Sequence, residues 1–363
     1  MLEMHLGRVI KIISQREGIT EVLLDMDHPI KKAVNYDRMT GKISEGDLVT
    51  LNTTAASLSL GTGGYHFVLT NHAHQMLPMS PGGHGMKVRY TPSQVKVPFI
   101  EEKLTGQETT FNSPLNLKGR LICFGELHSM ISPLCAFFRY YSKIKIRIGY
   151  IMTDHAALPL AFSRNIACLK ERNMLDTVIT IGNAFGGDME CVNIYTGLQA
   201  ASVIENCDII LVSMGPGITG TGTRYGFSGL DMGFYLDLAY RYGGQCFFVP
   251  RISFAELRSR HFGISHHSLT ILRDVVQSPI FITLPSLEKQ KMRFLYQQVR
   301  ENRLPDKYDI IFTDGKGIRK AMEHYNISVT SMGRGMREDP AFFYAVGAVA
   351  KKALLSFYSM DRL

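Results

Sequence analysis

The stretch Asp208-Ile-Ile-Leu-Val-Ser-Met214 runs directly into Gly215-Pro-Gly-Ile-Thr-Gly-Thr-Gly-Thr-Arg-Tyr-Gly-Phe-Ser-Gly229. A near-continuous apolar run is typical of a strand buried on both faces of a parallel sheet, and the glycine- and threonine-rich segment then forms the loop at its carboxyl end. Glycines let a backbone approach an anion closely, and threonine hydroxyls add donors. We therefore predict a phosphate-type binding loop that uses Gly215, Gly217, Gly220, Thr221, Gly222 and Thr223. A long βα loop without a ligand is the alternative.

Similar units repeat on both sides of this stretch. The predicted strands are Leu121–Glu126, Ile146–Met152, Thr177–Gly182, Asp208–Met214, Gln245–Arg251, Ile280–Leu284, Tyr308–Thr313 and Ser328–Met332. Each is followed by a helical pattern, as in βαβ units. The sequence thus predicts an α/β domain over residues 118–363 with a parallel sheet of the doubly wound, Rossmann-like type; a (β/α)₈ barrel is the alternative.

The first hundred residues show a different pattern of short strands separated by turns. The predicted strands are Gly7–Ile13, Thr20–Met26, Lys31–Tyr36, Asp47–Asn52, Tyr65–Asn71, Met86–Thr91 and Val95–Ile100. This spacing predicts a small all-β barrel or sandwich over residues 1–104, with OB-like and SH3-like barrels as candidates, and a linker over 105–117.

The net charge of +8 on 363 residues is concentrated in one region. Residues 118–172 hold nine Lys or Arg against three acids. A basic face attracts nucleic acid or an anionic metabolite, and solvated helix ends are the alternative explanation.

The apolar segments indicate a cytoplasmic protein. The helical segment Pro340–Met360 is expected to be a buried packing helix or a dimer contact, too short and too broken to anchor the chain in a membrane. We expect a homo-oligomer without a membrane partner. The six cysteines fall mostly in apolar patterns without a C-x-x-C pair, which favours buried reduced thiols.

Titratable side chains recur where the predicted strands end. Glu126, His128, Asp154 and Asp188 are the predicted catalytic residues, and His128, Asp154 and Asp188 could also hold a divalent metal. Asn183 and Asp314 follow two further strands and are predicted ligand contacts. Helix capping is the alternative for both Asp154 and Asp314, and a hydrogen bond to a core carbonyl is the alternative for His128.

Two later segments add ligand-binding candidates. Ser265 is a predicted helix N-cap that places His266 and His267 in the first turn, where adjacent residues diverge by about 100° and are not expected to share one metal. His266 is the predicted ligand contact of the two. Arg334, after the last predicted strand, could clamp a carboxylate or phosphate.

The glycine spacing gives only weak support for a dinucleotide cofactor. Gly215, Gly217 and Gly220 match a G-x-G-x-x-G pattern, but this lies in the fourth unit and no acid ends the next strand, so NAD(P) is not expected. The chain has no G-x-x-x-x-G-K-[ST], G-x-S-x-G or H-E-x-x-H motif.

A combination of segments resembles a bacterial family catalogued as domain of unknown function 3866, over nearly the full length. These segments are Gly61-Thr-Gly-Gly-Tyr-His66, Glu126-Leu-His-Ser129, Thr153-Asp154 with Ala157-Leu-Pro-Leu-Ala-Phe-Ser163, Ala184-Phe-Gly-Gly-Asp188, Met214-Gly-Pro-Gly217 with Gly220-Thr-Gly-Thr223, Ser265-His-His-Ser268 and Met332-Gly-Arg-Gly335. The resemblance implies membership and no particular activity.

Together these patterns favour a hydrolase or transferase, metal-assisted or not, acting on a small phosphate-bearing or otherwise anionic metabolite at the strand ends. The alternative is a nucleic-acid or regulatory ligand-binding module without catalysis. A scaffold without chemistry is a third class.

Overall fold

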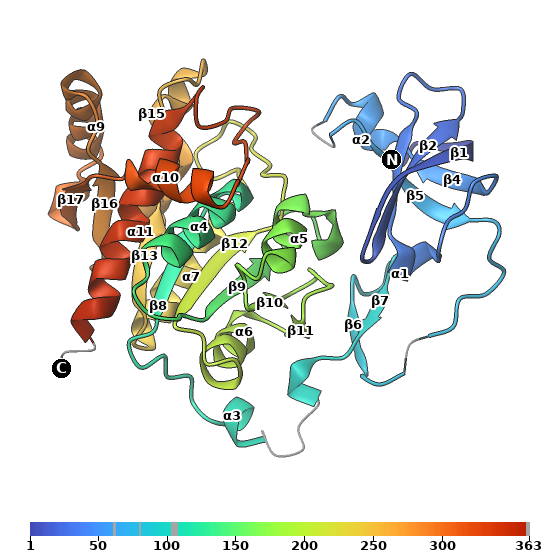
Figure 1. The fold of residues 1–363 in the computed structure, drawn as a ribbon, viewed down its shortest axis with the longest axis horizontal. Helices are drawn as coiled ribbons and strands as arrows, with labels where there is room; N and C mark the ends of the chain where they lie inside the picture. The colour runs from blue at the N-terminus through green and yellow to red at the C-terminus, as the bar shows by residue number, and fades with distance from the viewer. Residues whose placement is uncertain (61–62, 80, 103–107, 361–363) are drawn as a thin grey trace. The chain divides into compact units, whose positions relative to one another are not determined.

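The computed structural model describes residues 1–60, 63–79, 81–102 and 108–360. Gly61 and Thr62 of the first family segment therefore lie outside the described residues, as do residues 105–107 of the expected linker. The chain forms two compact units, Met1–Pro98 and Phe99–Leu363, each traced in Figure 1.

The first unit contains a closed barrel, as predicted. Its strands are β1 (Met4–Arg16), β2 (Ile19–Asp25), β3 (Lys32–Asn35), β4 (Leu48–Asn52) and β5 (His66–Asn71), in the order β1-β2-β3-β5-β4. Only β3 and β5 pair in parallel, which gives the Greek-key order of an OB-type barrel. Alternate residues such as Val22 and Leu24 fill its interior. The short helices α1 (Asp37–Thr40) and α2 (Thr54–Ser57) and the hairpin β6 (Gly85–Lys87) with β7 (Val95–Val97) complete the unit.

The second unit is built on a six-stranded sheet in which every pair is parallel. The strands are β8 (Leu121–Gly125), β9 (Ile148–Thr153), β10 (Thr177–Thr180), β11 (Met189–Glu190), β12 (Ile209–Met214) and β13 (Gln245–Val249), in the order β11-β10-β9-β12-β8-β13. The sheet is open at both ends. The doubly wound prediction is therefore confirmed, and the (β/α)₈ alternative is wrong.

Helices cover both faces of this sheet (Figure 1). The relevant helices are α4 (Ile131–Tyr141), α5 (Arg164–Glu171), α6 (Ile194–Gln199), which continues as the π-helix η4 (Ala200–Ile204), and α7 (Asp231–Arg241). From β8 through β9 to β10 the chain moves across the sheet in one direction, and from β10 through β12 to β13 it moves in the opposite direction. Because the crossovers are right-handed, α4 and α5 lie on one face of the sheet and α6 and α7 lie on the other. Two separate apolar clusters follow this division, with Leu134 in one and Leu236 in the other.

Neighbouring strands whose helices lie on opposite faces leave a crevice at their carboxyl ends, where ligands bind in open α/β sheets. β9 and β12 are such a pair, because α5 follows β9 and α7 follows β12. We call the side of the sheet on which its parallel strands end the carboxyl edge.

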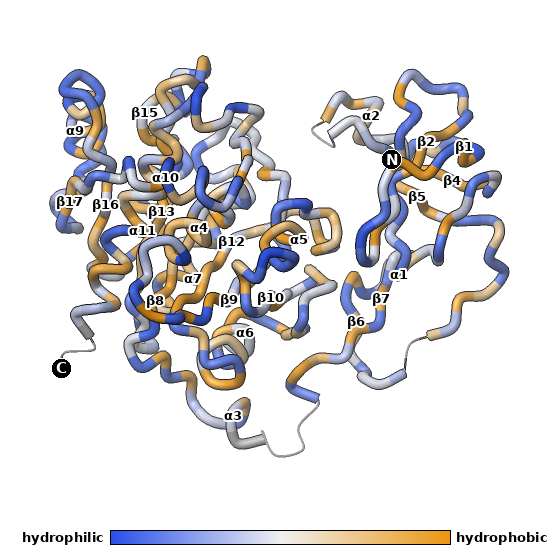
Figure 2. Tube along the Cα trace, in the orientation of Figure 1, coloured by the Kyte–Doolittle hydropathy of each residue, from blue (hydrophilic) through white to orange (hydrophobic). Residues whose placement is uncertain are grey.

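The remaining elements pack around the sheet. They are α3 (Glu108–Asn112), the hairpin β14 (Ile252–Ser253) with β15 (Gly263–Ile264), α8 (His266–Thr270) continuing as the π-helix η6 (Ile271–Val275), the parallel pair β16 (Phe281–Pro285) and β17 (Asp309–Thr313), α9 (Lys289–Glu301), α10 (Gly317–His324) and α11 (Pro340–Met360). Figure 2 shows that β8 and β12 are apolar, whereas α9 is more hydrophilic. The predicted strand Ser328–Met332 is wrong: positive φ angles at Met332 and Gly333 turn the chain there, and only an isolated bridge joins Ser331 to Arg334.

The expectation that α11 is too short to anchor the chain in a membrane is wrong. Among the described residues, Pro340–Ser359 is long and apolar enough to cross a membrane by length and composition, so shortness does not exclude a span. However, 61% of its apolar window is buried inside the protein, as in the core helix of a soluble protein. α11 packs against β16 and α4. The six cysteines are free and five of them are buried, as predicted.

Candidate functional site

Three titratable side chains meet at the β9–β12 crevice. His155 follows β9, and its Nε2 atom lies 2.7 Å from Oδ2 of Asp231, the first residue of α7. On the other side, Nδ1 of His155 lies 3.7 Å from Oδ1 of Asp154. We call Asp154, His155 and Asp231 the His155 group. An imidazole between two carboxylates can hold and release a proton.

Asp154 is held in place by the loop after β10. Its Oδ2 atom accepts a hydrogen bond of 2.8 Å from the backbone N–H of Asn183. Gly182 makes this possible, because a Cβ atom there would lie 2.3 Å from the same oxygen. Asp154 and Asn183 therefore lie together at the carboxyl edge, where the sequence analysis placed them.

His155 and Asp231 each shift the pKa of the other in the direction that favours the charged form. The hydrogen bond that His155 donates to Asp231 raises the pKa of His155 above its ordinary value and lowers the pKa of Asp231. Both side chains are partly exposed, at 25% for His155 and 38% for Asp231. Both side chains are thus open to solvent, which suits proton exchange with a ligand.

The glycine- and threonine-rich loop, residues 215–229, is a folded excursion rather than an open nest. At its base, Gly215 packs on Ala157, whose carbonyl oxygen would lie 2.4 Å from a Cβ at that glycine. Within the loop, backbone hydrogen bonds join Ser228 to Thr219 and Thr221 to Gly226. The hydroxyls of Thr221 and Thr223 contact each other at 2.9 Å. Close packing thus accounts for Gly215, and internal hydrogen bonds account for the two threonines.

The middle of this loop lies over α8. The ring of Phe227 stacks on the ring of His267 with centroids 4.0 Å apart. Gly220 leaves room for the same imidazole, since a Cβ there would lie 3.3 Å from its Nε2 atom, and Gly222, with φ of 81°, does so for Arg260. Gly217 has φ of 103° and nothing within 4 Å of a Cβ position, so it is the loop glycine that faces open space.

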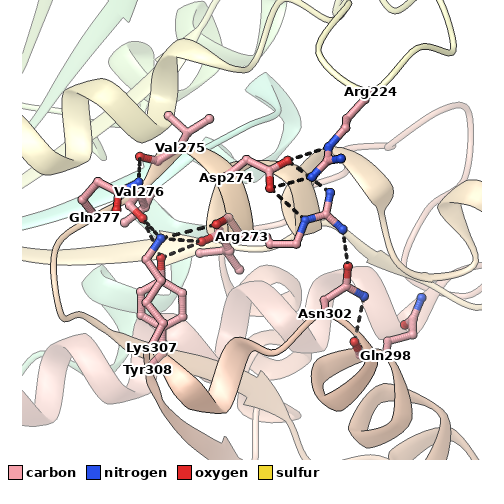
Figure 3. A network of polar contacts seen from close by, with 11 residues as sticks. Arg224, Arg273, Asp274, Val275, Val276, Gln277, Gln298, Asn302, Lys307 and Tyr308 are labelled. Carbon is pink, nitrogen blue, oxygen red and sulfur yellow. Dashed lines mark hydrogen bonds and ion pairs between the residues drawn. The ribbon is translucent and has the colours of Figure 1, made fainter.

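An arginine fastens the loop to the end of the same helix (Figure 3). Arg224 donates two hydrogen bonds of 2.9 Å to the carboxylate of Asp274 in η6, which Arg273 also contacts. The end of η6 is satisfied in turn by Tyr308, whose hydroxyl donates to the carbonyl of Leu272 at 2.7 Å. This network, drawn in Figure 3, fixes the loop against α8 and η6.

Three imidazoles gather beneath the loop. They belong to His261, His266 and His267, and each ring offers one nitrogen that lies within 4.8 Å of the nitrogens of the other two rings. We call these residues the histidine cluster. Ser265 caps α8 as predicted, because its side chain accepts from the backbone N–H of His267. The expectation that His266 and His267 diverge is wrong: their ring centroids are 4.3 Å apart because side-chain torsions bring adjacent rings together at a helix start.

Next to the histidine cluster, three arginines surround one buried carboxylate. Glu256 accepts hydrogen bonds from Arg251 at 3.1 Å, Arg258 at 2.9 Å and Arg334 at 3.1 Å. These contacts, led by that with Arg258, hold the pKa of Glu256 far below its usual range. Arg334 also lies 3.6 Å from a second buried carboxylate, that of Asp339, so its partners in the structure are carboxylates of the protein itself. With Arg260 beside His261, positive charge exceeds negative charge here.

Glu126 lies at the end of β8, fully buried. Its Oε2 atom accepts a hydrogen bond of 2.6 Å from Ser268 of α8, and its Oε1 atom has no partner among the described residues. Burial raises its pKa to about 7, against the hydrogen bond of Ser268 and the charge of Arg251. A carboxyl poised near neutrality can exchange a proton, which suits the predicted role.

His128 occupies a core position instead of the site. The hydroxyl of Ser163 accepts from the N–H of Ile166 and lies 2.7 Å from Nε2 of His128, while Nδ1 lies 3.2 Å from the carbonyl of Met214. Burial lowers the pKa of His128 to about 4, so the ring is neutral. The predicted grouping of His128 with Asp154 and Asp188 at one metal is not formed.

Two other predicted residues lie elsewhere. Asp188 pairs with Lys170 and accepts from the backbone N–H of Val178 at 2.9 Å, near the start of β10, because the chain doubles back before β11. Asp314 follows β17, which pairs with β16 in a separate sheet, and it accepts from the N–H of Lys316 in a local turn. Neither carboxylate joins the carboxyl edge.

Sequence reasoning missed several side chains of the site. His155 directly follows the predicted residue Asp154, and Asp231 is the first residue of α7. Both carried a usable signal, since the end of β9 and the start of α7 meet at the crevice. Glu256 and His261 lie in the 254–262 excursion between β14 and β15, which no periodic pattern marks.

The comparisons with known proteins give a family without an assigned activity. The model of a family described as protein of unknown function (DUF3866) matches residues 32–350. This match confirms the resemblance seen in the sequence. No curated protein matches the chain.

Proposed function

The chain belongs to the DUF3866 family, whose description names no activity, and we propose that it is a cytoplasmic hydrolase or transferase acting on a small anionic metabolite. The substrate binds at the carboxyl edge of the six-stranded sheet. The observation that carries this proposal is the placement of His155 between Asp154 and Asp231 at the β9–β12 crevice.

In this proposal His155 transfers a proton to or from the substrate. Asp231 holds the imidazole through Nε2 and favours its charged form, while Asp154 faces the other ring nitrogen. A histidine whose pKa is raised by a paired carboxylate and whose side chain is a quarter exposed is suited to general acid and base catalysis. Asn183 supports it indirectly by fixing Asp154.

Positive charge after β13, a strand of the same sheet, supports an anionic substrate. Arg251, Arg258 and Arg334 share the carboxylate of Glu256, and Arg334 also lies 3.6 Å from the carboxylate of Asp339. With Arg260 from the same excursion, the arginines outnumber these two carboxylates, and the excess of positive charge attracts phosphate or carboxylate groups. Planar guanidinium groups match the oxygens of both phosphate and carboxylate groups.

Binding can be tested first by thermal unfolding. A ligand that binds the native state alone raises the unfolding midpoint by mass action. We expect phosphate-bearing metabolites to raise the midpoint and their uncharged parent compounds to leave it unchanged. The shift is expected to shrink in Arg258→Gln and to persist in Arg241→Gln, an exposed arginine of α7. Equal shifts with charged and uncharged compounds would exclude the anion proposal.

The barrel favours a second candidate function. Five-stranded Greek-key barrels of the OB type often bind single-stranded nucleic acid. If the full chain is such a module, its retention on single-stranded DNA or RNA must fall steeply as salt rises. Retention that is absent at low salt would remove this candidate.

A further inference from the structure

We propose that the histidine cluster beneath the loop, His261, His266 and His267, binds one divalent transition metal ion, with Zn²⁺ as the ion that its ligands fit best. This site shares no residue with the His155 group. It therefore stands or falls independently of the proposed proton transfer.

The spacing of the rings is close to that of a three-histidine site. One nitrogen of each ring lies within 4.8 Å of the others. Nitrogens bound to a tetrahedral Zn²⁺ at about 2.0–2.1 Å lie about 3.4 Å apart. Small rotations of the side chains are enough to close this difference. His261 ends the 3-10 helix η5 (Ser259–His261) and the other two begin α8, so the three come from two adjoining segments.

Two of the rings have buried nitrogen atoms with no hydrogen-bond partner among the described residues. They are Nε2 of His266 and Nδ1 of His267, and only 5% of the surface of His267 is exposed. Buried polar atoms in native proteins are nearly always hydrogen-bonded, so two unpartnered atoms side by side call for an explanation. A shared metal ion satisfies both.

The third ring is already oriented for coordination. Nε of Arg260 donates to Nε2 of His261 at 3.3 Å, which requires a lone pair on that nitrogen. The proton therefore lies on Nδ1, which is 2.8 Å from the hydroxyl of Ser265. A hydrogen bond from the second ring nitrogen to a fixed acceptor is the usual way in which proteins orient a metal-binding histidine. Arg260 is exposed and must move aside when the metal binds.

The surroundings of the three rings disfavour their protonated form, which cannot bind a metal. Burial and then nearby positive charge lower the pKa of all three, to about 3 for His261 and His267. Arginines disfavour a bare dication, but Glu256 offsets part of their charge. Three protein ligands leave a fourth position open on Zn²⁺, and the remaining positive charge favours an anion or hydroxide there.

The test is metal binding by the full-length chain, prepared metal-free and without a polyhistidine tag. Zn²⁺ affinity is measured by competition with a chromophoric chelator, and Co²⁺ substitution is followed by visible absorption. We expect one ion per chain and the intense absorption of tetrahedral Co²⁺. His261→Gln and His266→Gln each remove one ligand and are expected to weaken binding by at least about tenfold.

Two control variants make the assignment specific. His72→Gln changes an exposed barrel histidine whose Nε2 contacts Thr50, and it is expected to leave the affinity unchanged. Arg260→Ala frees the lone pair of His261 and is expected to strengthen binding. Failure of the wild type to bind one ion, or unchanged affinity in both His261→Gln and His266→Gln, would overturn the proposal. Weaker binding by Arg260→Ala would also overturn it, even if the histidine variants fail to fold.

Discussion

The Nε2 atom of His155 lies 2.7 Å from Oδ2 of Asp231, and this contact joins the end of β9 to the start of α7. These residues are far apart in the sequence and meet because β9 and β12 are neighbours in the sheet. The contact places a titratable pair in the crevice that the doubly wound topology creates.

Replacing Asp231 with asparagine is expected to lower the pKa of His155, since the hydrogen bond that His155 donates to Asp231 is the largest cause that raises it. NMR titration of the His155 ring measures this value. Asp309→Asn, an exposed carboxylate of β17, is the control and should leave the titration unchanged. An unchanged His155 pKa in Asp231→Asn would contradict the pairing.

The same pair makes a pH-dependent contribution to stability. The pKa of His155 is raised above 6.5, so its contribution is complete below pH 6.5 and is lost as pH rises through the folded-state value. The pKa of Asp231 is lowered below 3.8, so its contribution is lost only as pH falls through that lowered value. Asp231→Asn should therefore cost about 0.5 kcal/mol of unfolding free energy near pH 5.5, because the pair is partly exposed, and less near pH 9. Denaturant unfolding at both pH values checks this; an equal loss at both would contradict it.

Gly182→Ala is expected to be more destabilising than Gly82→Ala. Gly82→Ala is the closer control, because Gly182 and Gly82 have similar positive φ, 62° and 73°, and alanine costs about 1 kcal/mol of backbone strain at either position, whereas φ of 103° at Gly217 adds strain of its own. Only at Gly182 does the added Cβ meet the Asp154 carboxylate, at 2.3 Å. This overlap should add about 1–3 kcal/mol to the loss, measured by denaturant unfolding. Equal losses of unfolding free energy in the two variants would show that the side chain of Asp154 moves aside at no cost.

Glu126→Gln is expected to remove the pH dependence that Glu126 gives to the free energy of unfolding. Folding raises the pKa of Glu126 from 4.5 to about 7, so the folded state loses stability as pH rises across this interval, by up to about 3 kcal/mol. Glutamine keeps an oxygen for Ser268 and carries no charge. The unfolding free energy of the variant minus that of the wild type should therefore be larger at pH 8 than at pH 4.5. A difference that is constant with pH would show that Glu126 is not the titrating group.

Arg224→Ala is expected to loosen the loop of residues 215–229 without unfolding the protein. Arg224 and Asp274 form a two-point contact that ties the loop to η6. Hydrogen exchange measured by mass spectrometry should become faster in this loop and remain unchanged in β12. Arg241→Ala, on α7, is the control. Unchanged exchange in the loop of Arg224→Ala would mean that the stacking of Phe227 on His267 holds it alone.

Much of the fold could be predicted from the sequence because apolar runs such as Ile209–Met214 report burial on both faces. The site was only partly predictable. Asp154 and Asn183 could be placed because they directly follow strands of the main sheet. Asp188 and Asp314 follow strands too, but strand order decides which ends share an edge, and no local pattern encodes that order. His261 was missed as a partner of His266 because the excursion between β14 and β15 has no periodicity.

Proton transfer by His155 to or from a bound anionic substrate can be tested by measuring the turnover of His155→Gln. The substrate is the phosphate-bearing compound that raises the unfolding midpoint of the wild type. We expect His155→Gln to bind this compound still but to convert it at least about a hundredfold more slowly. Turnover at the wild-type rate by the variant, or no conversion of any stabilising compound by the wild type, would show that His155 does not transfer the proton.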